Sequence, residues 1–151
     1  MHRTALAAVI VSSMMLCSCM GKSINAVSSK EFSKTVLECG YCAEDGISVT
    51  DSEDGTSTKV LADNGWLAGF YECADYDIAE NEFYSECNAA DMDDIKDIGN
   101  NVQSAEKTSG NNYSLYIRVG KTCLMMTGPT ERSDEMKDLA AKLGYSDGKK
   151  K

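Results

Sequence analysis

The first periodic segment of the chain begins after a serine. Ser28 and Glu31 have the spacing of a capping box, in which each side chain satisfies a free backbone amide at the start of a helix. Apolar side chains then recur at helical spacing, at Phe32, Val36 and Cys39. Gly40 is typical of the residue just past a helix end. The pattern predicts a helix over residues 29–39.

Short apolar runs separated by turn residues follow this helix. Residues 46–50 alternate between apolar and polar side chains, residues 56–62 form a second run, and residues 66–73 are apolar and aromatic. Aspartate, serine, asparagine and glycine dominate the segments between them, at 51–55 and 63–65. We therefore predict three strands joined by two turns.

Asp75 is placed to cap a second helix. Ile78, Ala79, Glu82 and Phe83 would share one side of this helix. Two continuations fit the sequence equally. The helix either continues, or breaks near Asn88 and restarts, through Met92, Ile95 and Ile98.

The last third of the chain begins with a polar segment, residues 99–112, which has no periodicity and is predicted to be a long loop, either functional or disordered. Residues 113–119 and 122–127 read as two strands joined by Gly120 and Lys121, a pair that suits a tight hairpin. Residues 131–143 form the last predicted helix.

Together these elements predict an α+β fold. We expect a single antiparallel sheet of about four strands, with helices packed on one face, in a domain spanning residues 28–145. The first and last helices align without gaps, from Ser29 to Tyr41 and from Ser133 to Tyr145. This similarity reflects either an internal duplication or shared capping chemistry. Residues 146–151 are expected to form a disordered tail.

The N-terminus has the features of a signal peptide. Arg3 gives a basic start, and an apolar run over residues 5–16 follows. This run is shorter than the roughly 20 apolar residues that a transmembrane helix needs. A basic start, an apolar run of this length and small residues after it indicate secretion.

The end of the apolar run, Leu16-Cys17-Ser18-Cys19, resembles the bacterial lipobox. The resemblance implies that residues 1–18 are a signal peptide, that Cys17 leaves with it, and that Cys19 is acylated. Residues 19–27 would then be a lipidated tether that holds the domain on the bilayer, because two acyl chains anchor a protein stably. The alternative is an ordinary signal peptide that is cut without lipidation.

Cleavage after Ser18 would remove His2, which is the single histidine of the chain. Catalytic systems that use a histidine base, and zinc sites with histidine ligands, are therefore excluded for the mature chain. Loss of Arg3 would leave 14 basic against 24 acidic residues, a formal charge of −10. This charge argues against a nucleic-acid partner, since nucleic-acid binding requires basic charge.

Five cysteines remain after Cys19, at positions 39, 42, 73, 87 and 123. Cys39, Cys42, Cys73 and Cys87 are candidate disulfide partners, with the connectivity open. Cys39 and Cys42 form a C-x-x-C pair at a helix C-terminus, where the helix dipole opposes the thiolate that redox chemistry needs. Cys123 lies within a predicted strand and is interpreted as a buried small hydrophobe.

Two further motifs imitate known binding loops. Residues 91–94 begin like a calcium loop, but Ile95 occupies the next ligand position. Gly120-Lys121-Thr122 imitates the end of a phosphate loop, but Leu115 stands where the first glycine should be. We therefore predict no metal site, no cofactor and no catalytic residues.

Several short motifs resemble small uncharacterised lipoproteins of clostridia and related bacteria. They are Phe32 with Gly40-Tyr41, Phe70-Tyr71-Glu72 followed by Asp75 and Ala79, Arg118-Val119 with Thr122, and Leu143-Gly144-Tyr145. The matching stretch covers residues 28–145. The resemblance implies topology and location, because that family has no settled activity.

The sequence as a whole predicts an extracytoplasmic lipoprotein on the cell membrane. Its partner would be the lipid bilayer, reached through acylated Cys19, and an envelope protein of unknown identity is a further candidate. We expect the domain to be a non-catalytic binding or interaction module of unknown ligand. The alternative is a thiol-disulfide redox protein or sensor that uses Cys39 and Cys42.

Overall fold

The computed structural model of the chain describes residues 24–99 and 101–146. Cys17, Cys19 and the rest of the predicted signal peptide lie outside these residues, as does most of the predicted tail. The helices are α1 (Ser29–Glu38), α2 (Tyr76–Ala89) and α3 (Ser133–Lys142), with short 3₁₀ turns at Glu44–Gly46 and Thr130–Arg132. The strands are β1 (Ile47–Ser52), β2 (Gly55–Leu61), β3 (Leu67–Cys73), β4 (Ile95–Gly99), β5 (Val102–Ser109), β6 (Asn112–Val119) and β7 (Thr122–Pro129).

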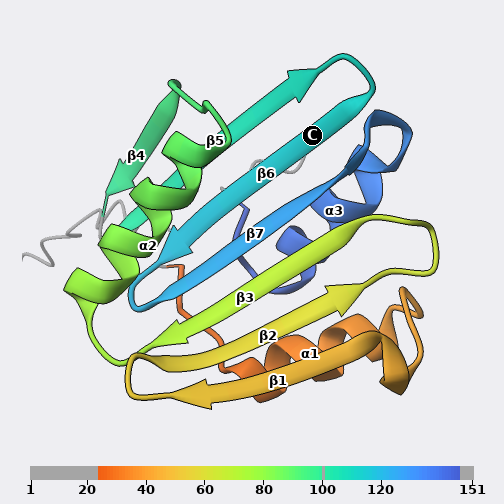
Figure 1. Ribbon diagram of the computed structural model, residues 1–151, viewed down its shortest axis with the longest axis horizontal. Coiled ribbons are helices and arrows are strands. Elements are labelled where there is room, and N and C mark those ends of the chain that lie inside the picture. Colours follow the sequence, from red (N-terminus) through yellow and green to blue (C-terminus); the bar gives the residue numbers. More distant parts are fainter. Residues whose placement is uncertain (1–23, 100, 147–151) are drawn as a thin grey trace, which may run out of the picture.

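The strands form one antiparallel sheet in the order β1-β2-β3-β7-β6-β5-β4 (Figure 1). The prediction of an α+β fold agrees with this sheet, but the prediction of about four strands is wrong, because the sheet has seven. Two meanders, β1 to β3 and β4 to β7, meet where β3 pairs with β7. The first and last strands of the second meander therefore lie far apart, and β7 is central.

The helices cover both faces of the sheet, so the prediction that they pack on one face is also wrong. In Figure 1, α2 lies in front of the sheet, and α1 and α3 lie behind it. The buried side chains agree, because those of α1 and α3 belong to one hydrophobic cluster and those of α2 to another. The chain thus builds three layers, with the sheet in the middle.

Two segments were assigned to the wrong element. Residues 95–99 are strand β4 rather than helix, and α2 ends at Ala89. Most of the predicted loop at 99–112 is strand β5, which pairs along its length with β6. The alternation of apolar and polar residues along β5 is weak because one of its buried positions is the polar Gln103. This side chain is hydrogen-bonded to Arg118 and Tyr84.

The starts of α1 and α2 and the end of α1 agree with the sequence. Ser28 and Glu31 form the predicted capping box, and the Asp75 carboxylate accepts a hydrogen bond from the Ile78 amide. α1 and α3 end in the same way. The glycine after each helix has a positive φ, and the next amide, of Tyr41 or Tyr145, donates back into the last turn. This is a Schellman motif, and it is shared by the Gly-Tyr ends of the two segments.

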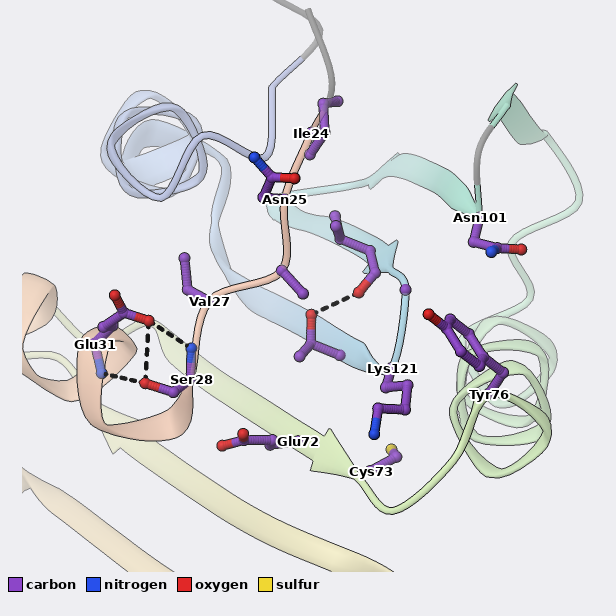
Figure 2. Close-up of a pocket in the computed structure, with 14 residues that line it drawn as sticks. Ile24, Asn25, Val27, Ser28, Glu31, Glu72, Cys73, Tyr76, Asn101 and Lys121 are labelled. Carbon is purple, nitrogen blue, oxygen red and sulfur yellow. Dashed lines mark hydrogen bonds between the residues drawn. The ribbon is translucent and has the colours of Figure 1, made fainter.

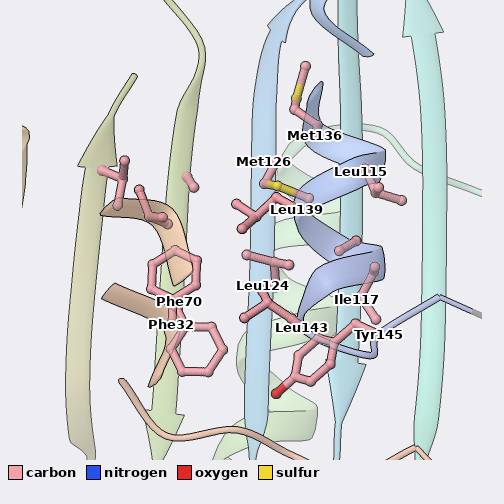
Figure 3. Packing of buried hydrophobic residues seen from close by; sticks show 14 of the residues in the cluster. Phe32, Phe70, Leu115, Ile117, Leu124, Met126, Met136, Leu139, Leu143 and Tyr145 are labelled. Carbon is pink, nitrogen blue, oxygen red and sulfur yellow. The ribbon is translucent and has the colours of Figure 1, made fainter. Parts of the chain in front are cut away.

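The core between the sheet and the pair α1 and α3 is the larger of the two (Figure 3). Phe32 of α1 stacks on Phe70 of β3, with ring centroids 4.7 Å apart. Tyr145, just past α3, lies 6.5 Å from the Phe70 ring. Trp66 is fully buried, and its indole Nε1 donates a 3.0 Å hydrogen bond to Glu135 of α3. These contacts fix both helices on the sheet.

The core between the sheet and α2 is smaller and rich in sulfur. Ala79, Phe83 and Cys87 of α2 pack on the sheet. The other sulfur-bearing side chains in this cluster are Cys73, Met92, Cys123 and Met125. Thiol and thioether side chains adapt to irregular gaps, so this layer needs fewer large aromatic rings than the opposite one.

Candidate functional site

A pocket of about 520 Å³ lies at one end of the strands (Figure 2). We call it the N-terminal pocket, because residues 24–28 form one of its walls. Its other walls come from the first turn of α1, the end of β3, the start of α2, and the turns before β5 and between β6 and β7. Its lining includes Glu31, Glu72, Cys73, Asn101 and Lys121.

Hydrogen bonds hold these segments together. The amide of Val27 donates to the Tyr145 hydroxyl at 3.0 Å, and Ile24 and Val27 pack against the larger core. Two residues of the predicted tether, Ile24 and Val27, therefore lie against the domain. On the other side, the Gly120 amide donates to the Asn101 carbonyl at 2.9 Å, which joins the two turns.

The charges in the pocket are mostly negative. Glu72 accepts a 2.8 Å hydrogen bond from the Ser29 amide, so its carboxylate lies at the positive end of the α1 dipole. The hydrogen bonds of Ser28 lower the pKa of Glu31, with Lys34 adding a smaller effect. Lys121 is the basic side chain of the lining, and its Nζ donates to the Ala74 carbonyl at 3.3 Å. The lining thus carries two carboxylates and one amine, a net negative charge.

The five described cysteines are free thiols and lie in two places. Cys39 ends α1, as predicted, and Cys42 is buried a turn later. Burial raises the pKa of Cys42, and the nearby carboxylates of Asp63 and Asp45 raise it further. This environment opposes thiolate chemistry at the C-x-x-C pair.

The other three described cysteines lie in the core beneath α2, and two of them interact. Cys73 ends β3 and lines the N-terminal pocket, and it is a diagonal neighbour of Cys123 on β7 within the same hydrophobic cluster. This pair was missed, because Cys123 was interpreted only as a small hydrophobe. No signal along the chain could reveal it, since the pairing of β3 with β7 joins segments 50 residues apart.

One part of the sheet carries exposed side chains on the face that α2 occupies. Along β3, Ala68 and Phe70 point into the larger core, so Leu67 points to the opposite face, where it is 50% exposed. Its cross-strand partner Leu61 is 58% exposed. Ser48, Thr50 and Lys59 are exposed on the same face. We call these five residues the open face.

No protein-family model matches the chain. No curated protein matches it either. Among solved structures, the chain is similar to a GTP binding regulator from Thermotoga maritima, with 11% sequence identity and a TM-score of 0.44. The similarity covers 74% of this chain and 84% of that one.

A second, smaller pocket of about 240 Å³ lies near the end of α2. Lys107 reaches across it and forms a 2.8 Å ion pair with Asp91. Its other lining residues are mostly neutral and polar, among them Ser109, Asn112, Ser114 and Thr127. Because its one lysine is already paired with a carboxylate, this pocket has no free charge to attract an ionic ligand.

Within residues 24–99 and 101–146, no group of three or more histidine, cysteine or acidic side chains is arranged to hold a metal ion. In the same part of the chain, no helix is long and apolar enough to cross a bilayer.

Proposed function

We propose that the chain is a lipoprotein held on the outer side of a cell membrane by acylated Cys19, and that its domain is a non-catalytic module that binds an envelope protein. The resemblance of Leu16-Cys17-Ser18-Cys19 to a lipobox supports the anchor. The open face supports the binding role. The observation that carries the proposal is the position of the open face relative to the tether.

The tether would leave little freedom between membrane and domain. Only residues 20–23 separate Cys19 from Ile24, which already packs on the domain. A fully extended chain spans at most about 18 Å over these five steps. The N-terminal pocket would therefore face the bilayer.

The exposed leucines lie at the other end of the strands. β3 starts at Leu67 and ends at Cys73, beside the N-terminal pocket. Six residue steps along a strand span about 20 Å. Leu61 and Leu67 would thus point away from the membrane, where an envelope protein can reach them. Two adjacent exposed leucines beside serine, threonine and lysine resemble the apolar centre and polar edge of a protein interface.

The anchor is tested by labelling bacteria that express the full chain with a fatty acid. We expect label on the wild type and on Cys17→Ala, because Cys17 leaves with the signal peptide. Cys19→Ala should carry no label and should leave the membrane fraction, since it lacks the acylated thiol. A wild type without label would contradict the anchor and leave an ordinary signal peptide as the explanation.

The binding role is tested by crosslinking in the native membrane. We expect a defined crosslinked protein with the wild type, and at least tenfold less of it with Leu61→Asp combined with Leu67→Asp, because a charge at the centre of an apolar contact is costly. Val49→Asp is the matched control, since Val49 lies on the neighbouring strand, is 57% exposed and points to the opposite face. An identical crosslinking pattern for all three chains would contradict binding through the open face.

A further inference from the structure

Cys73 and Cys123 are brought together by the central strand pair. Tyr71 of β3 is directly opposite Cys123 of β7, and the Cys73 amide donates to the Lys121 carbonyl at 2.9 Å. Side chains two residues apart on a strand point to the same face. Cys73 is therefore a diagonal neighbour of Cys123, and both belong to the cluster beneath α2.

The two thiols differ in access. Cys73 is the last residue of β3 and lines the N-terminal pocket, where it is 7% exposed. Cys123 is fully buried, and its Sγ lies 3.2 Å from the Ala79 carbonyl. A molecule in the pocket can therefore contact Cys73, whereas Cys123 is buried outside the pocket lining.

The electrostatic environment also favours Cys73 over Cys123 as the thiol that reacts first. The neighbouring Cys123 thiol lowers the pKa of Cys73, although burial and the carboxylates of Glu82, Asp75 and Asp54 oppose this effect. The neighbouring Cys73 and burial together raise the pKa of Cys123. Cys73 is therefore the better nucleophile, since the thiolate is the form that attacks a disulfide.

We propose that Cys73 and Cys123 form a thiol–disulfide exchange pair, and that its substrate is a low-molecular-weight disulfide bearing amine groups that enters the N-terminal pocket. The carboxylates of Glu31 and Glu72 outnumber the single Lys121 in the lining, which favours a cationic substrate. The inference does not depend on the lipid anchor or on the open face.

The exchange takes place in two steps. The Cys73 thiolate attacks one sulfur of the substrate, so that a mixed disulfide forms and the first substrate thiol leaves as a thiolate. Cys123 then loses its proton to solvent and attacks the Cys73 sulfur, which breaks the mixed disulfide and releases the second substrate sulfur as a thiolate. The two substrate thiolates take up the two protons that Cys73 and Cys123 have lost. The protein pair loses two electrons and becomes a disulfide, and the substrate disulfide gains them and becomes two thiols.

Cys73 is well placed to move during the second step. It ends β3, and the last directly opposed pair of the β3–β7 ladder is Glu72 with Thr122. Diagonal neighbours in a sheet are slightly farther apart than a disulfide requires, so one of the two residues must shift. The chain after Cys73 leaves the sheet at Ala74, and a strand end can adjust more easily than the middle of β7.

The test uses the reduced full-length protein and cystamine, a disulfide with two amine groups. Free thiols are alkylated after the reaction, and peptides are mapped by mass spectrometry. Cleavage after glutamate separates Cys73 from Cys87, because Glu80, Glu82 and Glu86 lie between them. We expect a Cys73–Cys123 disulfide as the main product. The anionic disulfide dithiodipropionate should react at least tenfold more slowly.

Three variants separate the roles of the cysteines. Cys123→Ser should accumulate cysteamine on Cys73, because the second step is blocked. Cys73→Ser should leave Cys123 unmodified, since Cys123 cannot reach the pocket. Cys87→Ser is the matched control, because Cys87 is a fully buried cysteine of the same cluster and lies outside the pocket lining. It should react like the wild type.

Two results with the wild type would overturn the proposal, and neither depends on a variant that must fold. One is modification of Cys39, Cys42 or Cys87 with Cys73 left free. The other is a stable cysteamine adduct on Cys73 without a bond to Cys123. Equal rates with cystamine and dithiodipropionate would overturn the assignment of a cationic substrate.

Discussion

Replacing Phe70 by alanine is expected to lower the free energy of unfolding by about 3–5 kcal/mol, as is usual for a buried phenylalanine. Phe70 is fully buried in the larger core, where its ring stacks on Phe32 of α1 and lies near Tyr145. The substitution would leave a cavity bounded by a helix, a strand and the C-terminal segment. None of these can close it without giving up other contacts.

Urea unfolding, followed by the fluorescence of the single tryptophan Trp66, measures this effect. Leu67→Ala is the matched control, because Leu67 lies on the same strand but is 50% exposed. It should change the free energy of unfolding by about 0.5 kcal/mol or less. If Phe70→Ala cost no more than Leu67→Ala, the packing of α1 on β3 would be refuted.

Gly55→Ala is expected to destabilise the fold by roughly 3 kcal/mol or more, through backbone strain and overpacking together. Gly55 has a φ of +134°, which side chains other than hydrogen rarely allow. An added Cβ would lie 2.1 Å from the Glu72 carbonyl oxygen and 2.9 Å from the Cys73 Cα. Both are backbone atoms of β3, so the clash can be relieved only by moving the strand.

Gly65→Ala separates the cost of backbone strain from the cost of a steric clash with β3. Gly65 also has a positive φ, +84°, but an added Cβ would meet no atom within 4 Å. Its replacement should cost only the left-handed backbone conformation, about 1–2 kcal/mol. Thermal unfolding of both variants checks the difference. Equal losses would show that β2 and β3 are not in close contact at Gly55.

Several elements could be predicted because their causes are local. The capping box at Ser28, the aspartate cap at Asp75 and the glycine that follows α1 each depend on residues within one or two helical turns. The hairpin of β6 and β7 is similar, since Gly120 supplies the positive φ of its turn and both strands are apolar. These features need no distant partner.

The errors have the opposite origin. β4 and β5 carry too few apolar residues to resemble strands, and they are strands because β5 pairs with β6 and β4 pairs with β5. Gln103 is buried because Arg118 and Tyr84 satisfy its amide. α2 has one apolar side, but the sequence of the helix does not predict which face of the sheet this side covers. The number of strands and the placement of the helices were therefore misjudged together.

The sequence by itself determined the N-terminal caps of α1 and α2, the end of α1, the turn between β6 and β7 and the acidic charge, because each of these depends on the residues themselves or on their neighbours along the chain. Only the tertiary structure decided the seven-stranded order, the two covered faces and the meeting of Cys73 with Cys123. The pairing of β3 with β7 brings these two cysteines together across 50 residues. Such a pairing arises from the competition of all strands for partners and a buried face, which no local pattern records.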